Sequence, residues 1–112
     1  MEKSEALYLN GADLITAERR RQVEKEGWSA EHDGEHEPDT LAYAALCYLL
    51  PAAVRKFELA SKSFFEWFWP FEMKYWKPTP EDRVKELVKA GALIAAEIDR
   101  IQRQNQTSKE SA

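Results

Sequence analysis

The last part of the chain has the clearest alternation of apolar and polar positions. Beyond Asp82, apolar or small residues recur at spacings of three and four, as Val84, Leu87, Val88, Gly91, Ile94, Ala95, Ile98 and Ile101. This spacing places them in one stripe on a helix. The segment Thr79-Pro80-Glu81-Asp82 is typical of a helix start, with a hydroxyl cap, a proline and two acids. We therefore predict a helix from there to about Gln104, with Gly91 marking the close approach of another helix.

Two further helices are predicted in the middle of the chain. Pro38 and Asp39 precede the run Leu41 to Leu50, which is apolar nearly all round and suits a central helix with Asp39 as N-cap. Pro51 must kink or end it. The pattern then resumes on one face with Val54, Phe57, Ser61, Phe64, Phe65 and Phe68. This predicts a third helix over about 52–69, which Pro70 ends.

The first helix is predicted over about 12–26 and has an interrupted stripe. Leu14 and Ile15 begin it, and the next positions on that face are Glu18, Arg19, Gln22 and Val23. Either this helix is only partly buried, or its charged groups line a pocket. No strand pattern rises above the helical ones. We therefore predict an all-α fold, a compact bundle of about four helices, in one domain over 1–104 with a flexible tail over 105–112.

The composition narrows the class of protein. The chain of 112 residues has a formal net charge of −4, which does not favour a general nucleic-acid binder. Its single cysteine, Cys47, lies in an apolar run and is interpreted as a small buried hydrophobe. No basic region followed by an apolar run opens the sequence, and the longest apolar stretch is too short to span a bilayer. We expect a soluble cytoplasmic protein that does not insert into membranes.

Both histidines lie in one acidic segment between the first two helices, "GWSAEHDGEHEPD". His32 and His36 are four apart, but Gly34 and Pro38 argue against a regular helix that would bring them together. The segment matches neither the zinc-protease nor the calcium-loop pattern. We predict no metal site. Two interpretations stay open: a connection whose His and Asp bond helix ends, or a ligand-recognition loop with Trp28 as a stacking face.

Aromatic residues crowd the connection before the last helix. The run Phe64 to Trp76 cannot bury all of its rings on one helix face. The connection is either pinned over the core by aromatic anchors, or exposes a protein interface, or offers stacking faces to a base with Lys74, Lys77 and Arg83 for phosphates. As a surface for a host protein or a second copy of the chain, it comprises Trp67, Trp69, Phe71 and Trp76.

Several motifs together resemble a group of small phage and prophage proteins of unassigned function. They are "ITAERRRQVEKEGW", "EHDGEH", "WKP" and "RVKELVKAGALIAAEIDRI", spread over about 14–102. The resemblance implies a phage setting, hence the host cytoplasm. The "AERRRQVEKEGW" helix, the "LAYAAL" segment and the "PEDRVKELV" helix are weakly similar to the ryanodine-receptor repeat domain. Bacterial and phage members of that family are suspected of binding nucleotide-derived ligands, which directs attention to Trp28, Tyr43 and the loop between them.

A third family has the same fold class but a metal site that this sequence lacks. Nucleotide pyrophosphohydrolases of the MazG type carry several carboxylates at helical spacing for magnesium. Here only Glu2 and Glu5 give the E-x-x-E spacing. No residues have the order and partners expected of a nucleophile and its base, so binding is favoured over catalysis.

The function expected from the sequence is that of a small phage-type protein that binds a nucleotide or nucleotide-derived signal without cleaving it. Its most concrete form is sequestration of a host anti-phage messenger. The residues expected to form the site are Arg19, Trp28, His32, Asp33, His36, Tyr43, Trp76, Lys77, Arg83 and Lys89. No catalytic residue, metal or cofactor is predicted. The alternatives are an interaction or inhibitor module acting through the aromatic surface, and a MazG-like pyrophosphohydrolase.

Overall fold

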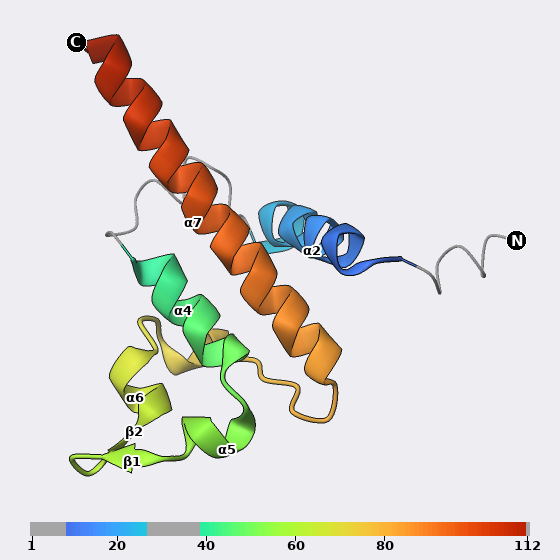
Figure 1. Cartoon of the computed structure of the whole chain (residues 1–112), viewed down its shortest axis with the longest axis vertical. Coiled ribbons are helices and arrows are strands. Elements are labelled where there is room, and N and C mark those ends of the chain that lie inside the picture. The colour runs from blue at the N-terminus through green and yellow to red at the C-terminus, as the bar shows by residue number, and fades with distance from the viewer. Residues whose placement is uncertain (1–8, 27–38, 112) are drawn as a thin grey trace, which may run out of the picture.

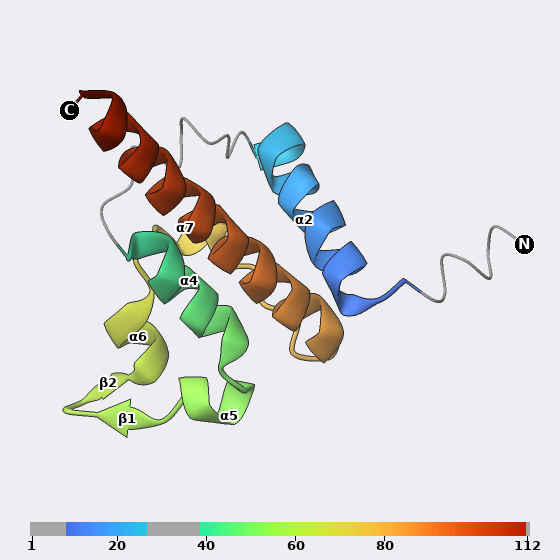
Figure 2. The same cartoon turned by 45° about the horizontal axis from the view of Figure 1, so that its top comes forward.

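A computed structural model describes residues 9–26 and 39–111 of the chain, with side chains over 9–25 and 39–107. The elements in order are α2 (Gly11–Glu26), α4 (Thr40–Leu49), α5 (Ala52–Arg55), β1 (Glu58–Leu59), β2 (Lys62–Ser63), α6 (Phe64–Phe68), the 3-10 turn η1 (Met73–Tyr75) and α7 (Arg83–Ser111). The long α7 is central, with α4 packed on one side and α2 on the other (Figures 1 and 2). The predicted all-α class is confirmed, since the described residues add only a two-stranded hairpin.

Small side chains allow α4 and α7 to lie close together. The core cluster consists of Leu41, Ala44, Ala45, Tyr48, Ala90, Leu93 and Ala96, each at most 5% exposed. Alanines on both helices keep the two backbones near each other, so the surrounding side chains pack at high density. Cys47 is also fully buried, and burial raises the pKa of its thiol to about 11. The interpretation of Cys47 as a buried hydrophobe is confirmed.

The apolar stripe of α7 is not its buried face. Five of its large side chains are 41–61% exposed, namely Val84, Leu87, Ile94, Ile98 and Ile101. The opposite face enters the core and combines alanines with three charged residues, Glu86, Glu97 and Arg100, each less than 8% exposed. An amphipathic helix normally buries its apolar stripe. Here the alanine face packs against α4, and the larger aliphatic side chains remain outside.

The buried Glu86 organises the end of α4. Pro51 ends that helix, as predicted, which leaves carbonyls of its last turn without helical partners. Arg55 donates to the carbonyl of Leu50 at 2.8 Å and to Glu86 Oε2 at 3.0 Å. Arg83 donates to the carbonyl of Tyr48 at 2.9 Å and to Glu86 Oε1 at 3.1 Å. One carboxylate therefore holds the two guanidinium groups that satisfy the end of α4.

A second buried pair fixes the start of α4. Arg100 donates to both carboxylate oxygens of Glu97, at 2.6 and 3.1 Å. Glu97 Oε2 also accepts the backbone N–H of Asp39 at 3.1 Å. Asp39 occupies the N-cap position of α4, as predicted. Its backbone is left-handed, with φ at 69°, and its side chain makes no capping bond.

The prediction of one continuous helix over 52–69 is wrong. The chain forms α5, then the hairpin β1–β2 with Glu58 opposite Ser63, and only then α6. Ala60 and Ser61 both have positive φ, as a two-residue hairpin turn of type I′ requires. Ser63 then starts α6 with a capping box, in which its side chain and that of Glu66 bond each other's backbone N–H.

The ends of the two long helices differ from prediction to different degrees. α2 begins at Gly11, one residue before the predicted start, and Asn10 caps it by accepting the N–H of Asp13 at 2.8 Å. α7 begins at Arg83 rather than at Pro80, because Asp82 Oδ1 accepts the N–H of Lys85 at 3.1 Å and serves as the cap. It continues to Ser111, past the predicted end at Gln104.

Gly91 marks the contact of α7 with α2, as predicted. A Cβ atom at this position would lie 2.5 Å from Ile15 Cδ1 and 2.8 Å from Ile15 Cγ1. We expect Gly91→Ala to lower the free energy of unfolding by about 1 kcal/mol, since overpacking costs about 1–3 kcal/mol and better helix propensity returns about 1. Urea unfolding measures this change. Gly11→Ala is the matched control, because no atom lies within 4 Å of its added Cβ. If Gly91→Ala and Gly11→Ala changed the free energy of unfolding equally, this would contradict the close approach of Ile15 to Gly91.

Candidate ligand-binding cleft

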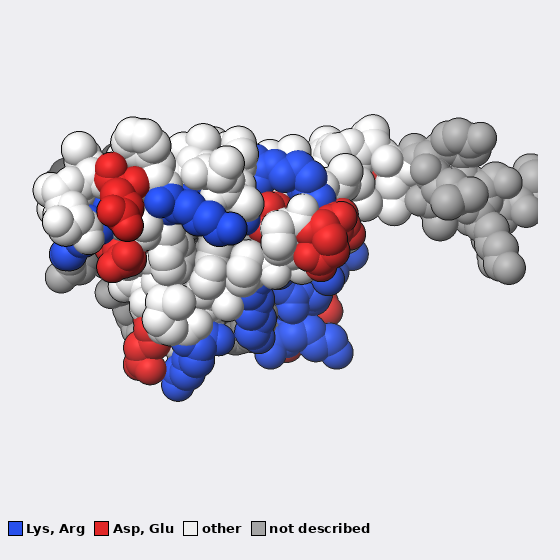
Figure 3. Space-filling model, turned by 90° about the horizontal axis from the view of Figure 1, so that it is seen from below, with Lys and Arg blue, Asp and Glu red and all other residues white. Residues whose placement is uncertain are grey.

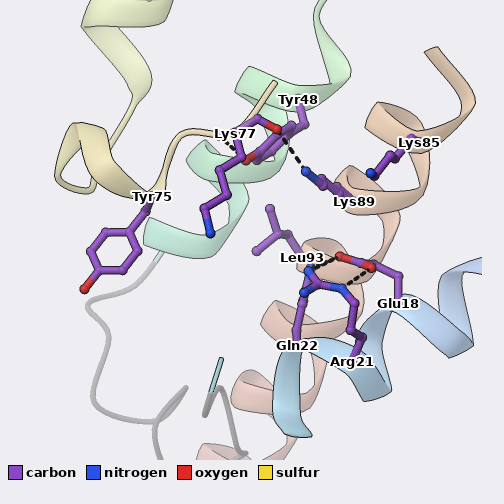
Figure 4. Close-up of a pocket in the computed structure, with 9 residues that line it drawn as sticks. All are labelled: Glu18, Arg21, Gln22, Tyr48, Tyr75, Lys77, Lys85, Lys89 and Leu93. Atoms are coloured by element: carbon purple, nitrogen blue, oxygen red, sulfur yellow. Dashed lines mark hydrogen bonds and ion pairs between the residues drawn. The ribbon is translucent and has the colours of Figure 1, made fainter. Parts of the chain in front are cut away.

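A cleft of about 330 Å³ lies where α2, α7, the end of α4 and the segment around η1 meet (Figure 4). Its volume is within the range of small-molecule sites. Nine residues line it: Glu18, Arg21, Gln22, Tyr48, Tyr75, Lys77, Lys85, Lys89 and Leu93. Leu93 belongs to the core cluster, so the cleft is built directly on the packed centre of the fold.

The cleft is locally positive on a protein that is negative overall. Four of its lining residues are cations, Arg21, Lys77, Lys85 and Lys89, and one is a carboxylate, Glu18. The whole chain has a formal charge of −4. Lys and Arg side chains also gather along the lower edge of the molecule in Figure 3. A cleft lined by one sign of charge raises the local concentration of ligands of the opposite sign.

Glu18 and Arg21 form the α2 side of the cleft. Arg21 donates to both carboxylate oxygens of Glu18, at 2.7 and 2.8 Å. Burial raises the pKa of Glu18, but the hydrogen bond and charge of Arg21, the hydrogen bond of Gln22 and the charge of Lys89 together leave that pKa below its ordinary value. Glu18 therefore stays ionised at neutral and mildly acidic pH and holds Arg21 in place.

Gln22 brings an unused hydrogen-bond acceptor to the cleft. Its side chain is 3% exposed, and its Nε2 donates to Glu18 Oε2 at 3.2 Å. Its Oε1 is buried and has no hydrogen-bond partner among the described residues. A buried polar atom without a partner costs about 1–3 kcal/mol, so a native protein usually provides a donor for it. A ligand hydroxyl or amine in the cleft is a donor of that kind.

Tyr48 connects the cleft to the aromatic core. Its hydroxyl accepts the backbone N–H of Lys77 at 3.1 Å, and the ammonium of Lys89 lies 5.4 Å from the centre of its ring. Lys89 Nζ also donates to the carbonyl of Lys77 at 2.9 Å. These contacts fix the backbone at Lys77 and the position of the Lys89 charge. Within the described residues, the ammonium groups of Lys77 and Lys85 have no ion-pair partner.

The structure brings two of the residues expected to bind ligand into this cleft, Lys77 and Lys89. Arg19 lies on the same helix as the cleft residues and forms a 3.6 Å ion pair with Asp99 of α7. Of the two interpretations of the first helix, the structure supports a pocket lined by polar groups for Glu18 and Gln22, and partial burial for Val23, which is 36% exposed.

Three other expected site residues lie away from the cleft. Arg83 binds the terminal carbonyls of α4, including that of Leu49, and Glu86. Trp76 packs among Tyr48, Phe65 and Trp69, with ring centres 4.6–5.0 Å apart. Tyr43 is 45% exposed and stacks on Phe68. The remaining four, Trp28, His32, Asp33 and His36, lie outside the described residues.

Most of the aromatic surface predicted for partners packs on the fold. Trp69, Phe71 and Trp76 are partly buried against the core cluster, so for them the interpretation as anchors of the connection agrees with the structure. Trp67 is different, because it is 47% exposed. It lines an apolar groove of about 490 Å³ with Leu46, Leu50, Leu59, Phe64 and Phe68.

Seven cleft residues were absent from the expected site, namely Glu18, Arg21, Gln22, Tyr48, Tyr75, Lys85 and Leu93. The polar positions in the stripe of the first helix were the available signal for Glu18 and Gln22. No comparable signal marked Tyr75 or Lys85, since an exposed lysine on a helix is usually a solvated side chain.

The described residues contain no group of three or more His, Cys, Asp or Glu able to hold a metal ion. None of their helices is long and apolar enough to cross a membrane. What the cleft offers chemically is a set of cations, one buried acceptor and two tyrosine rings. This combination suits the binding of an anion.

Comparison with known proteins yields no relative for this chain. No family model, no curated protein and no solved structure matches it.

Proposed function

We propose that this protein binds, without cleaving it, a phosphorylated small molecule of the nucleotide type in the cleft between α2 and α7. The observation that carries the proposal is that four cations and one carboxylate line a single cleft on an acidic protein. Lysine and arginine donate strong charge-assisted hydrogen bonds to phosphate oxygens. A ribose hydroxyl or a base amine would supply the donor that Gln22 Oε1 lacks.

The aromatic lining agrees with a ligand that also has a flat ring. Tyr48 and Tyr75 both line the cleft, and Tyr75 is 45% exposed. Base–aromatic stacking tolerates any base, since every base has a π face. Sequestration of a nucleotide messenger, in the phage setting that the sequence motifs imply, is the concrete biological form of this proposal.

We expect Lys77→Gln to weaken ligand binding about tenfold or more, because a hydrogen bond to a charged group contributes about 1.5–3 kcal/mol. The protein is incubated with a panel of nucleoside phosphates and cyclic nucleotides. Mass spectrometry then measures the free ligand before and after heat release from the protein. Depletion followed by intact recovery is the expected result.

Lys74→Gln is the matched control for this experiment. Lys74 lies three residues away on the same segment, outside the cleft, and its side chain is 65% exposed. The Lys74→Gln variant should bind the ligand with the same affinity as the unaltered protein. A new product mass would contradict binding without cleavage, and no depletion of any probe would contradict the proposal as a whole.

The second candidate is an interaction module that uses the apolar groove around Trp67. Leu59 is 57% exposed and Phe57 is 61% exposed, so this end of the molecule displays several large apolar side chains. Exposed apolar patches of this kind commonly mark interaction sites. If no nucleotide probe is depleted, this groove is the surface to mutate next.

A further inference from the structure

The apolar groove around Trp67 is a second concave site, formed by α4, the hairpin and α6. All six side chains that line it are aliphatic or aromatic, and its volume is about 490 Å³. Among the described residues, the groove and the cleft share no lining residue. Its volume is within the range of small-molecule sites, which are mostly apolar. The groove therefore suits the hydrocarbon part of a ligand.

Contacts within the protein hold the walls of the groove in place. Trp67 Nε1 donates to the carbonyl of Leu59 at 2.8 Å, which ties α6 to the hairpin. The ring of Phe64 lies 5.3 Å from that of Phe57 and 6.5 Å from that of Phe68, measured between ring centres. A ligand that enters a preformed groove loses less binding energy to the ordering of side chains.

Lys62 places a positive charge at the edge of this groove. Leu59 and Lys62 are directly opposite each other in the hairpin, so their side chains lie on the same face. The ammonium of Lys62 is 4.8 Å from the centre of the Trp67 ring. Leu59 and Trp67 both line the groove, and in the described part of the chain Lys62 has no ion-pair partner. A cation thus stands beside an apolar lining.

The nearby carboxylates are directed elsewhere. Glu58 pairs with Ser63 in the hairpin, one position away from Leu59, so it lies on the opposite face. Glu66 accepts hydrogen bonds from the hydroxyl and the backbone N–H of Ser63, at 3.1 and 3.3 Å. The charge of Lys62 is therefore available to an anionic group of a ligand.

We propose that the groove binds a free fatty acid, with the alkyl chain along the lining and the carboxylate on Lys62. An alkyl chain needs no hydrogen bonds, whereas an extended peptide brings one N–H and one C=O with each residue. The apolar lining cannot bond those groups, and the hairpin strands of two residues each are too short to add a peptide strand. A concave groove encloses a single chain, whereas side chains that enter a bilayer protrude from the surface.

Titration calorimetry of the full chain with dodecanoate, below its micelle concentration, tests this proposal. One molecule should bind per chain at micromolar concentration. The affinity should rise from octanoate to dodecanoate by up to about fourfold for each added methylene that the groove buries. Leu59→Glu should abolish binding, because it puts a carboxylate beside Lys62. Val84→Glu is the control, since Val84 is outside the groove and 61% exposed, compared with 57% for Leu59. The absence of saturable binding, or equal loss in both variants, would overturn the proposal.

Lys62→Gln tests the head group, and it stays informative if Leu59→Glu fails to fold. It should weaken dodecanoate binding about two- to fivefold, as loss of an exposed ion pair does, and leave dodecanol binding unchanged. Lys74→Gln, which removes an exposed charge outside the groove, should change neither. Equal affinity of Lys62→Gln and the unaltered protein for dodecanoate would overturn the placement of the carboxylate.

Sedimentation with vesicles of phosphatidylcholine and phosphatidylglycerol separates a free fatty acid from a lipid surface. The protein should stay in the supernatant. Binding to vesicles without binding to free dodecanoate would overturn the proposal in favour of a membrane contact. Nucleotide binding is a separate property, so Lys77→Gln should bind dodecanoate with the affinity of the unaltered protein.

Discussion

Replacing Glu86 with Gln is expected to lower the free energy of unfolding by about 3–5 kcal/mol, the usual cost of breaking a buried ion pair from one side. Glu86 is 1% exposed and receives hydrogen bonds from Arg55, Arg83 and the backbone N–H of Thr79. Gln keeps the shape but loses the charge, so Arg55, itself 6% exposed, is left buried without a counter-charge. Single domains have about 5–15 kcal/mol of stability in total, so the loss is a large share of it.

Urea denaturation followed by circular dichroism measures this change. Glu72→Gln is the control, because the Glu72–Lys74 pair is 3.8 Å apart and both side chains are at least 65% exposed. An exposed pair contributes about 0–1 kcal/mol. If both substitutions changed stability by the same small amount, the buried network would not have the role that its geometry indicates.

A double substitution separates the contribution of the Arg55–Glu86 charges to stability from the contribution of the volume that the two side chains fill. Arg55→Met and Glu86→Leu should each destabilise the protein strongly. The first leaves the buried Glu86 with only Arg83 as an ion-pair partner, and the second leaves Arg55 buried without a counter-charge. The double variant should cost clearly less than the sum of the two, because apolar side chains of similar size can replace a buried pair at little cost. Additive effects would contradict direct coupling across the 3.0 Å contact.

Helix positions were largely predictable from the sequence, because local signals define them. The prolines at 51 and 70 end helices where expected, and the observed α2 and α4 lie within a residue or two of the predicted ranges. The hairpin was missed because its turn uses Ala60 and Ser61 at positive φ, where Gly or Asn is the usual signal. The Ser-x-x-Glu spacing at Ser63 is a signal for the start of α6 that the prediction of one continuous helix did not use.

The orientation of α7 could not be read from periodicity. Periodicity locates an apolar stripe but does not say which neighbour covers it. In this fold the alanine face of α7 is the buried one. The charged residues on that face are paired, Glu86 with Arg55 and Glu97 with Arg100. The Arg55–Glu86 pairing depends on tertiary structure because it joins residues 31 positions apart, whereas Glu97 and Arg100 are three residues apart on α7 itself.

The positive charge of the cleft was predictable from the sequence, but only some of the residues that line it were. Lys77 and Lys89 were expected from their charge and from the segment that holds them, and both line the cleft. Arg83 had the same features, yet α4 ends beside it and uses its guanidinium. Four segments far apart in the chain form the cleft, so only the folded chain brings Gln22 to Lys89.

Loss of the Tyr48 side chain should both destabilise the fold and disrupt the cleft. Its ring is 5% exposed and lies 4.6 Å from the centre of Trp76 and 6.0 Å from that of Trp69. We expect Tyr48→Ala to lower the free energy of unfolding by about 3–5 kcal/mol, as other large aromatic truncations in cores do. Thermal and urea unfolding measure this loss, and little change would contradict the central packing of this ring.

Tyr48→Phe separates the two roles, because it keeps the ring and removes only the hydroxyl. The backbone N–H of Lys77, which that hydroxyl accepts at 3.1 Å, then lacks its partner. The fold should lose about 1 kcal/mol, the usual net value of one hydrogen bond. Affinity for the nucleotide probe depleted by the unaltered protein should fall as well, since the segment that carries Lys77 loses its anchor. If Tyr48→Phe lowered stability but left affinity unchanged, the Tyr48 hydroxyl would stabilise the fold without affecting ligand binding. The comparison therefore decides whether the aromatic core also positions the charges of the cleft.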